Sequence, residues 1–370
     1  MIFALAAVVA LVYQLIALFA VLRHRGRRDA PSSRFPRVSV LKPLYGLDPG
    51  FAGAARSHAA QQYPDFEILF GVRDPGAPEA AVVDQLQREF SGAVRLVVCQ
   101  TPAQNGKAGS LIDLAREARG DILVINDSDI TVSPDYLRRV IAPLEDARVG
   151  VVTCLYRASA DSIAGQWEAF SIAACFAPGV LVAPLMGVKD IGLGATLVVR
   201  ASDLHRAGGF EAVADYLADD NVLARNITRL GLRVHLSDVV VETHLGAPGW
   251  RHAWRHQLRW FRTIRVTNRP GYTGLPLTFA SVWALLAVDT GQWWLAVLTL
   301  IARLAAVLAT ARLLACPVTS RWWWLAPILD ITNAILWIAA LTGDTVEWRG
   351  QHLRLDQAGR IVCVNNVEPS

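Results

Sequence analysis

The sequence predicts an α/β protein with a mostly parallel sheet covered by helices, one N-terminal transmembrane helix and C-terminal membrane segments. Three observations predict this class. Short apolar runs alternate with helical patterns after residue 37, which is typical of strands joined by crossover helices. Residues 1–22 contain no charged side chain, and apolar stretches return after residue 275. We therefore expect a catalytic-type α/β domain tethered to a membrane.

The composition excludes an ordinary soluble enzyme. The 370 residues are 53% hydrophobic and only 18% charged, and the mean hydropathy is +0.32, which is too apolar for a fully hydrated chain. The net charge of +4 is modest, and the excess basic residues lie beside apolar segments, where anionic lipid headgroups are the natural partner. The basic residues form no nucleic-acid reading motif, so no nucleic-acid partner is predicted.

The five cysteines are scattered along the chain, with no Cys-x-x-Cys pair and no Cys/His metal spacing. We expect them to be reduced and structural. They are Cys99, Cys154, Cys175, Cys316 and Cys363.

The N-terminal run is long enough to cross a bilayer. At about 1.5 Å rise per residue, residues 1–22 span roughly 30 Å of hydrocarbon. A cleaved signal peptide is disfavoured, because the positive charges at Arg23, Arg25, Arg27 and Arg28 follow the apolar run instead of preceding it. The positive-inside rule then places the following domain in the cytoplasm. We expect a multi-pass protein of the cell inner membrane.

The predicted domains are an anchor (1–22), a basic linker (23–36), a catalytic domain (37–270), membrane segments (271–345) and a cytoplasmic tail (346–370). Arginines in the tail favour a cytoplasmic C-terminus, so an even number of crossings is expected after the catalytic domain. Three apolar stretches lie there, at 275–288, 292–311 and 322–341, and one of them is therefore expected to be interfacial or re-entrant.

Another apolar stretch, Phe170–Val188, is interrupted by two prolines. It reads either as an interfacial element that faces lipid or as a buried segment of the core.

Candidate ligand-binding residues follow the predicted strands. The strands are Val38–Leu41, Phe66–Gly71, Val94–Val98 and Ile122–Ile125, with helices near 78–90, 106–118 and 134–142. In parallel sheets of this kind, ligands bind outside the carboxyl ends of the strands. Asp74 and the pair Asp127 and Asp129 fall just past two such ends.

The sequence Asn126-Asp127-Ser128-Asp129 follows a buried-type strand. Two carboxylates at i and i+2 of an extended segment project to the same side and could share one divalent ion. Oxygen ligands suit Mg²⁺ or Mn²⁺, which also bind diphosphate and neutralise the charge on a departing nucleoside diphosphate. Asp127 and Asp129 are therefore candidate metal ligands, and the alternative is a solvated turn with two acidic caps.

Two further residues could contact a nucleotide sugar. Asp74, in GVRDP, could hold the base or a ribose hydroxyl, although Asp before Pro is also a common turn former. Lys107 opens a helix in the sequence Asn105-Gly106-Lys107-Ala108-Gly109, where free amides and a lysine suit phosphate. The alternative for Lys107 is an exposed side chain on a capped helix.

A second acidic pair, Asp219 and Asp220, lies on a helical pattern. A carboxylate placed near an acceptor hydroxyl could remove its proton, whereas an acidic start of a helix is the alternative. His244 could complete a metal's coordination, or it is an ordinary hydrogen-bonded histidine at a strand end.

A basic helix contains the sequence His256-Gln257-Leu258-Arg259-Trp260. Arg255, Arg259 and Arg262 share one face of that helix by their i, i+4, i+7 spacing. They could bind a diphosphate, contact a membrane surface, or do both.

Taken together, these motifs resemble the glycosyltransferases of family 21, the ceramide glucosyltransferase family. The runs VSVLKPLYGLDPGF and YPDFEILFGVRDP carry the resemblance, which extends from about residue 37 to 266 and includes the anchor and C-terminal membrane segments. It implies a GT-A fold and an inverting mechanism. It also implies that Asp74 is the first family aspartate, that Asp129 belongs to the metal motif and that Asp220 is the catalytic base.

The family's last signature is Gln or Arg, two residues, then Arg-Trp. Arg259 and Trp260 match it, whereas His256 stands in its first position. The short chain and the Arg/Ala-rich composition resemble the bacterial branch associated with hopanoid biosynthesis.

The resemblance implies transfer of glucose or N-acetylglucosamine from a UDP-sugar to the hydroxyl of a membrane lipid, either ceramide or a hopanoid. A processive polysaccharide synthase shares this chemistry but needs a channel, and the chain has few membrane segments for one. A non-catalytic membrane scaffold with a degenerate fold is the other alternative, and it is disfavoured because every acidic position is present.

Overall fold

The computed structural model describes residues 2–343, 345–348 and 351–366. The chain forms two compact units. The first contains Met1–Arg27, Arg157–Val188 and Leu245–Ser370, and the second contains Arg28–Tyr156 and Lys189–His244. The expected catalytic range, 37–270, therefore draws residues from both units.

The second unit is built on a sheet that has eight strands among the described residues, in the order β3-β2-β1-β4-β7-β6-β8-β5. The first four strands in this order pair in parallel, whereas β7 runs antiparallel to β4 and β6, and β5 antiparallel to β8. The strands are β1 (Val38–Pro43), β2 (Phe66–Val72), β3 (Val94–Val98), β4 (Ile122–Ile125), β5 (Ile130–Thr131), β6 (Val149–Ser159), β7 (Leu197–Arg200) and β8 (Arg233–His244). All four predicted strands are confirmed, and the fold class with them.

Both faces of this sheet are buried, which explains its continuous apolar runs. Neighbouring residues of β1 enter opposite cores: Val40 packs with Phe70 and Val124, and Leu41 with Leu69 and Leu123. The helices of this unit are α2 (Phe51–Ala59), α3 (Pro78–Glu89), α4 (Gly106–Glu117), α5 (Tyr136–Ile141), α8 (Ala201–Arg206) and α9 (Asp219–Thr228). The predicted helices at 78–90, 106–118 and 134–142 are confirmed as α3, α4 and α5.

The strand directions bring distant segments to one edge of the sheet. Strands β2, β1 and β4 are parallel, so their carboxyl ends lie at the same edge. Because β7 is antiparallel to β4, its first residue, Leu197, pairs with Ile125 at the end of β4. The loop before β7 therefore meets the turn after β4 at this edge.

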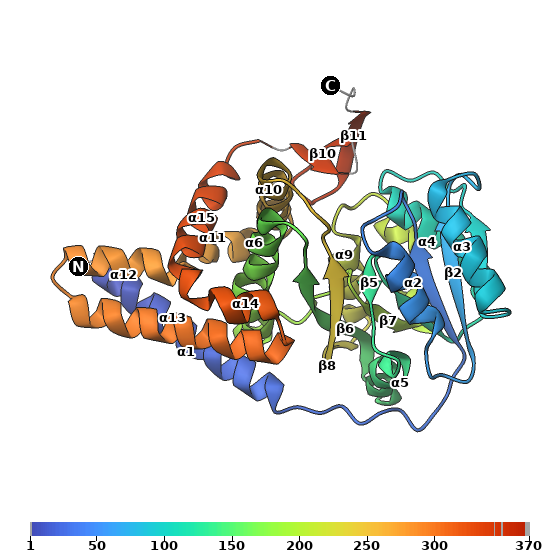
Figure 1. Ribbon diagram of the computed structural model, residues 1–370, viewed down its shortest axis with the longest axis horizontal. Coiled ribbons are helices and arrows are strands. Elements are labelled where there is room, and N and C mark those ends of the chain that lie inside the picture. Colours follow the sequence, from blue (N-terminus) through green and yellow to red (C-terminus); the bar gives the residue numbers. More distant parts are fainter. Residues whose placement is uncertain (1, 344, 349–350, 367–370) are drawn as a thin grey trace. The chain divides into compact units, whose positions relative to one another are not determined.

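The first unit consists mainly of helices, as Figure 1 shows. They are α1 (Ile2–Arg25), α6 (Ile163–Ser171), α7 (Ala177–Val182), α10 (Trp250–Thr267), α11 (Arg269–Gly274), α12 (Ala280–Asp289), α13 (Trp293–Leu314), α14 (Pro317–Trp322) and α15 (Ala326–Ala339), with a π-helical segment at Ile172–Phe176. Among the described residues, four helices are long and apolar enough to cross a membrane: Phe3–Arg25, Ile163–Met186, Trp293–Leu314 and Pro317–Ala339. A bent pair, Arg269–Thr278 with Ala280–Asp289, raises the number to five if it counts as one span.

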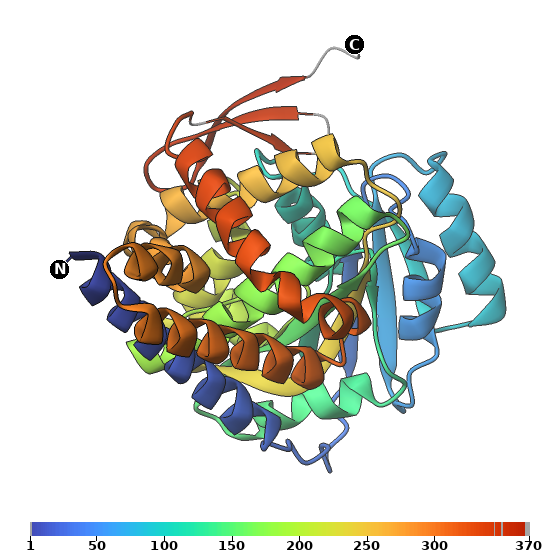
Figure 2. The same ribbon diagram turned by 60° about the vertical axis from the view of Figure 1, so that its left-hand side comes forward.

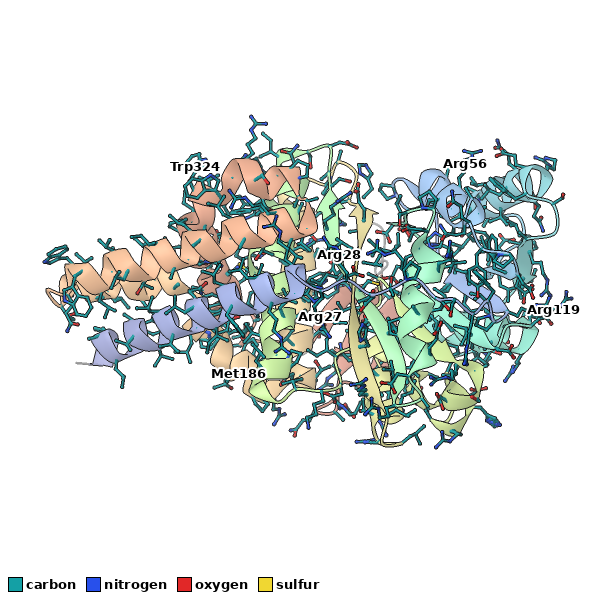
Figure 3. The ribbon with its side chains drawn as sticks, turned by 90° about the horizontal axis from the view of Figure 1, so that it is seen from below. Arg27, Arg28, Arg56, Arg119, Met186 and Trp324 are labelled. Atoms are coloured by element: carbon teal, nitrogen blue, oxygen red, sulfur yellow. The ribbon has the colours of Figure 1, made fainter. Side chains whose placement is uncertain are left out.

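Helix α1 packs alongside α12 and α13, and Figures 1 and 2 show all three together. Small side chains line the contact, with Ala7 buried against Ala284, Ala287 and Ala296, which allows close approach of helices in lipid. In Figure 1, α6 and α15 cross the direction of α1 and α13. The exposed side chains of Met186 and Trp324, labelled in Figure 3, also belong to this unit.

A buried ion pair joins two of these helices. Arg303 of α13 donates to Asp330 of α15 over 2.6 Å, and both side chains are buried. Arg303 also donates to the carbonyl oxygen of Ala174 over 2.8 Å, which supplies a partner for the irregular backbone of the π-helical segment.

The C-terminal segment, predicted only as a tail, forms a small antiparallel sheet of β9 (Thr345–Trp348), β10 (Gln351–Leu355) and β11 (Ile361–Asn366). Its first strand contacts α10, since Arg262 donates to the carbonyl oxygen of Thr345 over 2.7 Å and Arg255 lies 3.4 Å from Glu347.

Of the cysteines, Cys99, Cys154, Cys175 and Cys316 are free thiols, and the side chain of Cys363 lies outside the described part of the chain.

Candidate active site

The chain turns sharply after β4. Ile130 N–H donates to the carbonyl oxygen of Asp127 over 3.3 Å, and Ser128 and Asp129 form the turn. The expected extended geometry is therefore wrong, because β4 ends at Ile125 and the backbone closes on itself before β5 begins. Asp127 Oδ1 accepts from Lys107 Nζ over 2.7 Å, and the Asp129 carboxylate accepts from the Thr243 hydroxyl group.

Lys107 reaches the site from the start of α4. The Asn105 side chain caps this helix by accepting from the backbone N–H groups of Lys107 (3.0 Å) and Ala108 (3.3 Å). The Lys107 side chain is only 17% exposed, and its Nζ lies 3.9 Å from Asp219 in addition to its contact with Asp127. The helix is thus capped as one alternative expected, but its lysine points into an acidic cluster.

The first turn of α9 supplies the second acidic pair. Asp220 Oδ2 accepts from the N–H of Gly194 over 2.7 Å, and its Oδ1 accepts from the N–H of Asn221 over 2.8 Å. Asp219 is buried and lies 3.4 Å from the amide nitrogen of Asn105. The two neighbouring carboxylates therefore have different partners.

Gly194 lies at the centre of this arrangement. A Cβ atom at this position would be 3.2 Å from Asp127 Oδ2, 3.3 Å from Asp220 Oδ2 and 3.3 Å from Lys107 Nζ. Three predicted site residues from three separate segments therefore converge on one backbone position. The sequence analysis missed Gly194, and its only signal was the pair of glycines at 192 and 194 before β7.

The cluster has an excess of negative charge. Burial opposes the Lys107 ammonium, but Asp127, Asp219 and Asp220 outweigh burial and raise its pKa. Burial, together with the Asp219 carboxylate, raises the pKa of Asp220 to about 6. Burial and the neighbouring Asp127 also raise the pKa of Asp129. Carboxylates that resist ionisation in this way would be stabilised by an added cation.

These residues fit a divalent ion of the Mg²⁺ or Mn²⁺ type. In the described part of the chain, no three His, Cys, Asp or Glu side chains form a complete metal cage. Such ions, however, are commonly bound by one or two carboxylates and complete their coordination with substrate phosphates and water. Asp127 and Asp129 offer oxygen ligands of this kind, and the ion would offset the burial and the crowding of negative charge that raise the pKa of Asp129.

Two other predicted residues lie in loops or strand ends of the same unit. Asp74 follows β2 by two residues, is exposed, and accepts from the N–H of Gly76 over 2.8 Å, which is a turn contact. His244 ends β8 and packs beside Gly50, whose Cβ position would be 3.1 Å from His244 Cβ.

Arg259 and Trp260 belong to α10 in the first unit, whereas the cluster around Gly194 belongs to the second. The Trp260 ring packs against Phe176 and His256, with centroid separations of 5.4 Å and 5.5 Å. His256 is paired through Nδ1 with the buried carboxylate of Glu168. Two arginines of the expected diphosphate-binding face, Arg255 and Arg262, contact the C-terminal sheet.

The mostly parallel sheet covered by helices is a GT-A type fold. A mannosyltransferase from Pyrobaculum calidifontis, solved in complex with GDP-Man and Mn²⁺, shares the fold with a TM-score of 0.55 and 21% identity, covering 92% of this chain and 96% of that chain. The profile of Glycosyl transferase family 21 matches residues 2–361, and the chain belongs to that family. The predicted family is thus confirmed.

Two curated relatives are similar in sequence. Ceramide glucosyltransferase 1 of Caenorhabditis elegans is 23% identical over 376 residues, which is 96% of this chain and 79% of the relative. An N-acetylglucosaminyltransferase of Rhizobium meliloti (strain 1021) is 29% identical over 118 residues, which is 32% of this chain and 28% of the relative.

Proposed function

We propose that this chain transfers glucose or N-acetylglucosamine from a UDP-sugar to the hydroxyl group of a membrane lipid, ceramide or a hopanoid, with inversion at the anomeric carbon. One observation carries the proposal: Lys107, Asp127 and Asp220 converge on Gly194 at the carboxyl edge of the parallel strands. A base and a diphosphate-binding group would then lie within one small site. The similarity to a ceramide glucosyltransferase over 96% of the chain supports a lipid acceptor.

Asp220 acts as the general base. Its carboxylate takes the proton of the lipid hydroxyl while the lipid oxygen forms a bond to the anomeric carbon. The bond from that carbon to the β-phosphate oxygen breaks on the opposite face, and UDP leaves with the electron pair. The N–H groups of Gly194 and Asn221 hold the Asp220 carboxylate in a fixed orientation during this step.

Lys107 and the Asp127–Asp129 turn stabilise the UDP leaving group. Asp127 and Asp129 would hold a divalent ion, which would neutralise the charge that develops on the diphosphate. Lys107 donates to Asp127 in the structure and provides a second positive charge for the same oxygens. Asp74 is proposed to contact the nucleotide, and Arg259 and Trp260 the diphosphate and sugar.

The membrane segments supply proximity. A lipid acceptor confined to the bilayer meets a site tethered at the membrane surface, which replaces a three-dimensional search with a local one. We propose that the site lies on the cytoplasmic face of the inner membrane, because Arg23–Arg28 follow the first apolar helix.

The test is transfer by the full-length chain in liposomes. Vesicles that contain ceramide or a hopanoid alcohol receive Mn²⁺ and either UDP-glucose, UDP-N-acetylglucosamine or GDP-mannose, and the lipid products are measured by mass spectrometry. We expect one sugar per lipid from a UDP-sugar, and a β linkage from an α-linked donor. A polymeric product would instead support a processive synthase, and UDP–Mn²⁺ binding without transfer would support a non-catalytic scaffold.

A further inference from the structure

A lysine lies buried beneath the acidic turn. Lys42 is the fifth residue of β1 and has no exposed surface. Its Nζ donates to the carbonyl oxygen of Asp127 over 3.0 Å and lies 3.4 Å from Nδ1 of His58, which is also fully buried. A buried ammonium group is costly unless its protons have acceptors, so the position of the turn's backbone and that of the lysine depend on each other.

The hydrogen-bond directions around Asn126 follow from its partners. Asn126 Nδ2 lies 2.7 Å from the carbonyl oxygen of Ala195, which can only accept, so the amide nitrogen faces Ala195. Asn126 Oδ1 then faces His58 Nε2 at 3.3 Å. His58 Nδ1 lies 3.0 Å from the carbonyl oxygen of Ala54, which can only accept, and 3.4 Å from Lys42 Nζ. Contacts between buried polar atoms thus run from Lys42 through His58 and Asn126 to Ala195.

This series of contacts ends beside the proposed base. Ala195 follows Gly194, whose N–H donates to Asp220 Oδ2 over 2.7 Å. At its other end, Lys42 holds the carbonyl oxygen of Asp127. The buried residues therefore connect the turn after β4 with the loop that orients Asp220, and residues of β1 and α2 provide the connection.

We infer that Lys42, His58 and Asn126 are positioning residues that fix the Asp127–Asp129 turn and the Gly194 loop relative to each other. The inference rests on the proposed function for the ligand, a nucleoside diphosphate with a divalent ion. It predicts that loss of Lys42 disturbs ligand binding at the turn, and that loss of His58 disturbs mainly the orientation of Asp220.

The first test is Lys42→Met, which keeps a chain of similar length but cannot donate. UDP binding in the presence of Mn²⁺ is measured by calorimetry, and the melting temperature is measured without ligand. We expect UDP–Mn²⁺ affinity to fall by at least about tenfold, because the carbonyl oxygen of Asp127 loses its buried donor. The matched control is Ser39→Ala on the same strand, because Ser39 is equally buried and donates to Glu67 over 2.8 Å. The control should lower the melting temperature but leave UDP affinity unchanged.

His58→Phe is the second test. It tests the positioning role by itself if Lys42→Met does not fold. It removes the link to Asn126 but leaves the contact between Lys42 and the turn. We expect kcat to fall at least about tenfold, with UDP–Mn²⁺ affinity changed less than about twofold. An unchanged kcat in His58→Phe, or wild-type UDP affinity in a folded Lys42→Met, would overturn the inference.

Two reference samples separate this inference from the proposed function. The wild-type chain should bind UDP only with Mn²⁺, and Asp129→Ala should abolish that binding. If the wild-type chain binds no UDP, the proposed function fails. If both references behave as expected while the Lys42 and His58 variants match the wild type, only the positioning network fails.

Discussion

Asp219 and Asp220 are neighbours in the sequence, but their carboxylates contact different groups. Asp219 is buried and lies near Lys107 and Asn105. Asp220 is only partly buried, and two backbone N–H groups orient its carboxylate. Adjacent side chains on a helix point roughly 100° apart, so only one of them can face an acceptor. We assign the base to Asp220 and an electrostatic role to Asp219.

Asp220→Asn keeps the shape of the side chain and one of its two contacts with backbone N–H groups, but it cannot accept a proton. We expect sugar transfer to slow at least about a hundredfold, because general-base catalysis typically contributes about 10² to 10⁴ in rate. Donor affinity should stay near wild type, whereas the melting temperature should fall slightly because one backbone N–H loses its acceptor. Asp219→Asn is the matched control, and its loss of rate should be milder. A dead Asp219→Asn with an active Asp220→Asn would move the base by one residue.

The pH dependence gives an independent check on this assignment. The base works in its ionised form, and burial with the Asp219 charge raises the pKa of Asp220 to about 6. The transfer rate should therefore rise with pH through about 6 and level off above it. Removing the Asp219 charge by Asp219→Asn should lower that pKa and move the acidic limb to lower pH. Rate profiles of kcat/KM against pH measure both effects, and an unmoved limb in Asp219→Asn would contradict the coupling.

Gly194→Ala tests the convergence of the site. The added methyl group would lie 3.2–3.3 Å from Asp127, Asp220 and Lys107, and we expect transfer to fall at least about tenfold because small displacements of reacting groups are costly. Gly53→Ala in α2 is the control, since nothing lies within 4 Å of its Cβ position, and alanine favours a helix by about 1 kcal/mol. Transfer assays and melting temperatures should show a slowed but stable Gly194→Ala and a fully active Gly53→Ala. Full activity in Gly194→Ala would show that the cluster does not constrain the reaction.

The parallel half of the sheet could be predicted because its strands are buried on both faces and read as short apolar runs. The first strand extends to Pro43 and includes the fully buried Lys42, which a hydrophobicity pattern treats as a strand end. The Asp127–Asp129 turn was mistaken for an extended segment, because residue spacing does not fix backbone dihedrals. Gly194 could not be found, since only the antiparallel pairing of β7 with β4 brings it to the site.

The C-terminal sheet lies outside what the sequence predicts, because its strands are short and mix polar with apolar residues. Its contacts with α10 come from the tertiary structure. Arg262 donates to the carbonyl oxygen of Thr345 in β9. This contact ties the sheet to the helix that carries Arg259 and Trp260. The sheet therefore packs against the helix that carries the last family motif, Arg259 and Trp260, within the first unit.

Arg262→Met should loosen this attachment. Loss of a hydrogen bond from a charged donor costs about 1.5–3 kcal/mol, so we expect amide exchange in β10 (Gln351–Leu355) to accelerate on the order of tenfold or more. Arg251→Met, at an exposed position in the first turn of the same helix, is the control and should leave exchange unchanged. Hydrogen-exchange mass spectrometry of the detergent-solubilised chain measures the difference. Equal exchange in both variants would mean that the sheet is held by other contacts.

The contacts of α1 show which end of this helix lies beside the turn between α12 and α13. Ala7, near the start of α1, is buried with Ala287 and Leu295, which flank the turn between α12 and α13. The basic residues Arg23, Arg25 and Arg27 lie at the opposite end of α1. If that basic end is cytoplasmic, as the positive-inside rule requires, then the α12–α13 turn must lie on the outer side with the N-terminus.

With this topology, an apolar helix such as α15 does not have to cross the membrane. Helix α15 crosses the direction of α13 in Figure 1, and its exposed residues Ile328, Ile331, Ile335 and Ile338 form one face. A helix with one exposed apolar face is suited to lie in the interface. If the bent pair Arg269–Thr278 with Ala280–Asp289 forms one crossing and α13 returns, two crossings follow the second unit, which is the even number that a cytoplasmic C-terminus requires.

Single cysteines at two exposed positions test this topology. Thr290 lies in the α12–α13 turn, and Ser91 lies in the loop after α3; both are exposed. In intact spheroplasts, a membrane-impermeant maleimide should label Thr290→Cys, whereas Ser91→Cys should react only after permeabilisation. The parent chain reports any labelling of native cysteines, of which Cys99, Cys154 and Cys316 are buried.

The two positions must respond oppositely, because the basic residues place Ser91 on the cytoplasmic side and the packing of Ala7 places Thr290 on the outer side. Labelling of Ser91→Cys in intact spheroplasts would reverse the orientation of the whole chain, and protection of both positions would mean that the α12–α13 hairpin does not reach the outer surface.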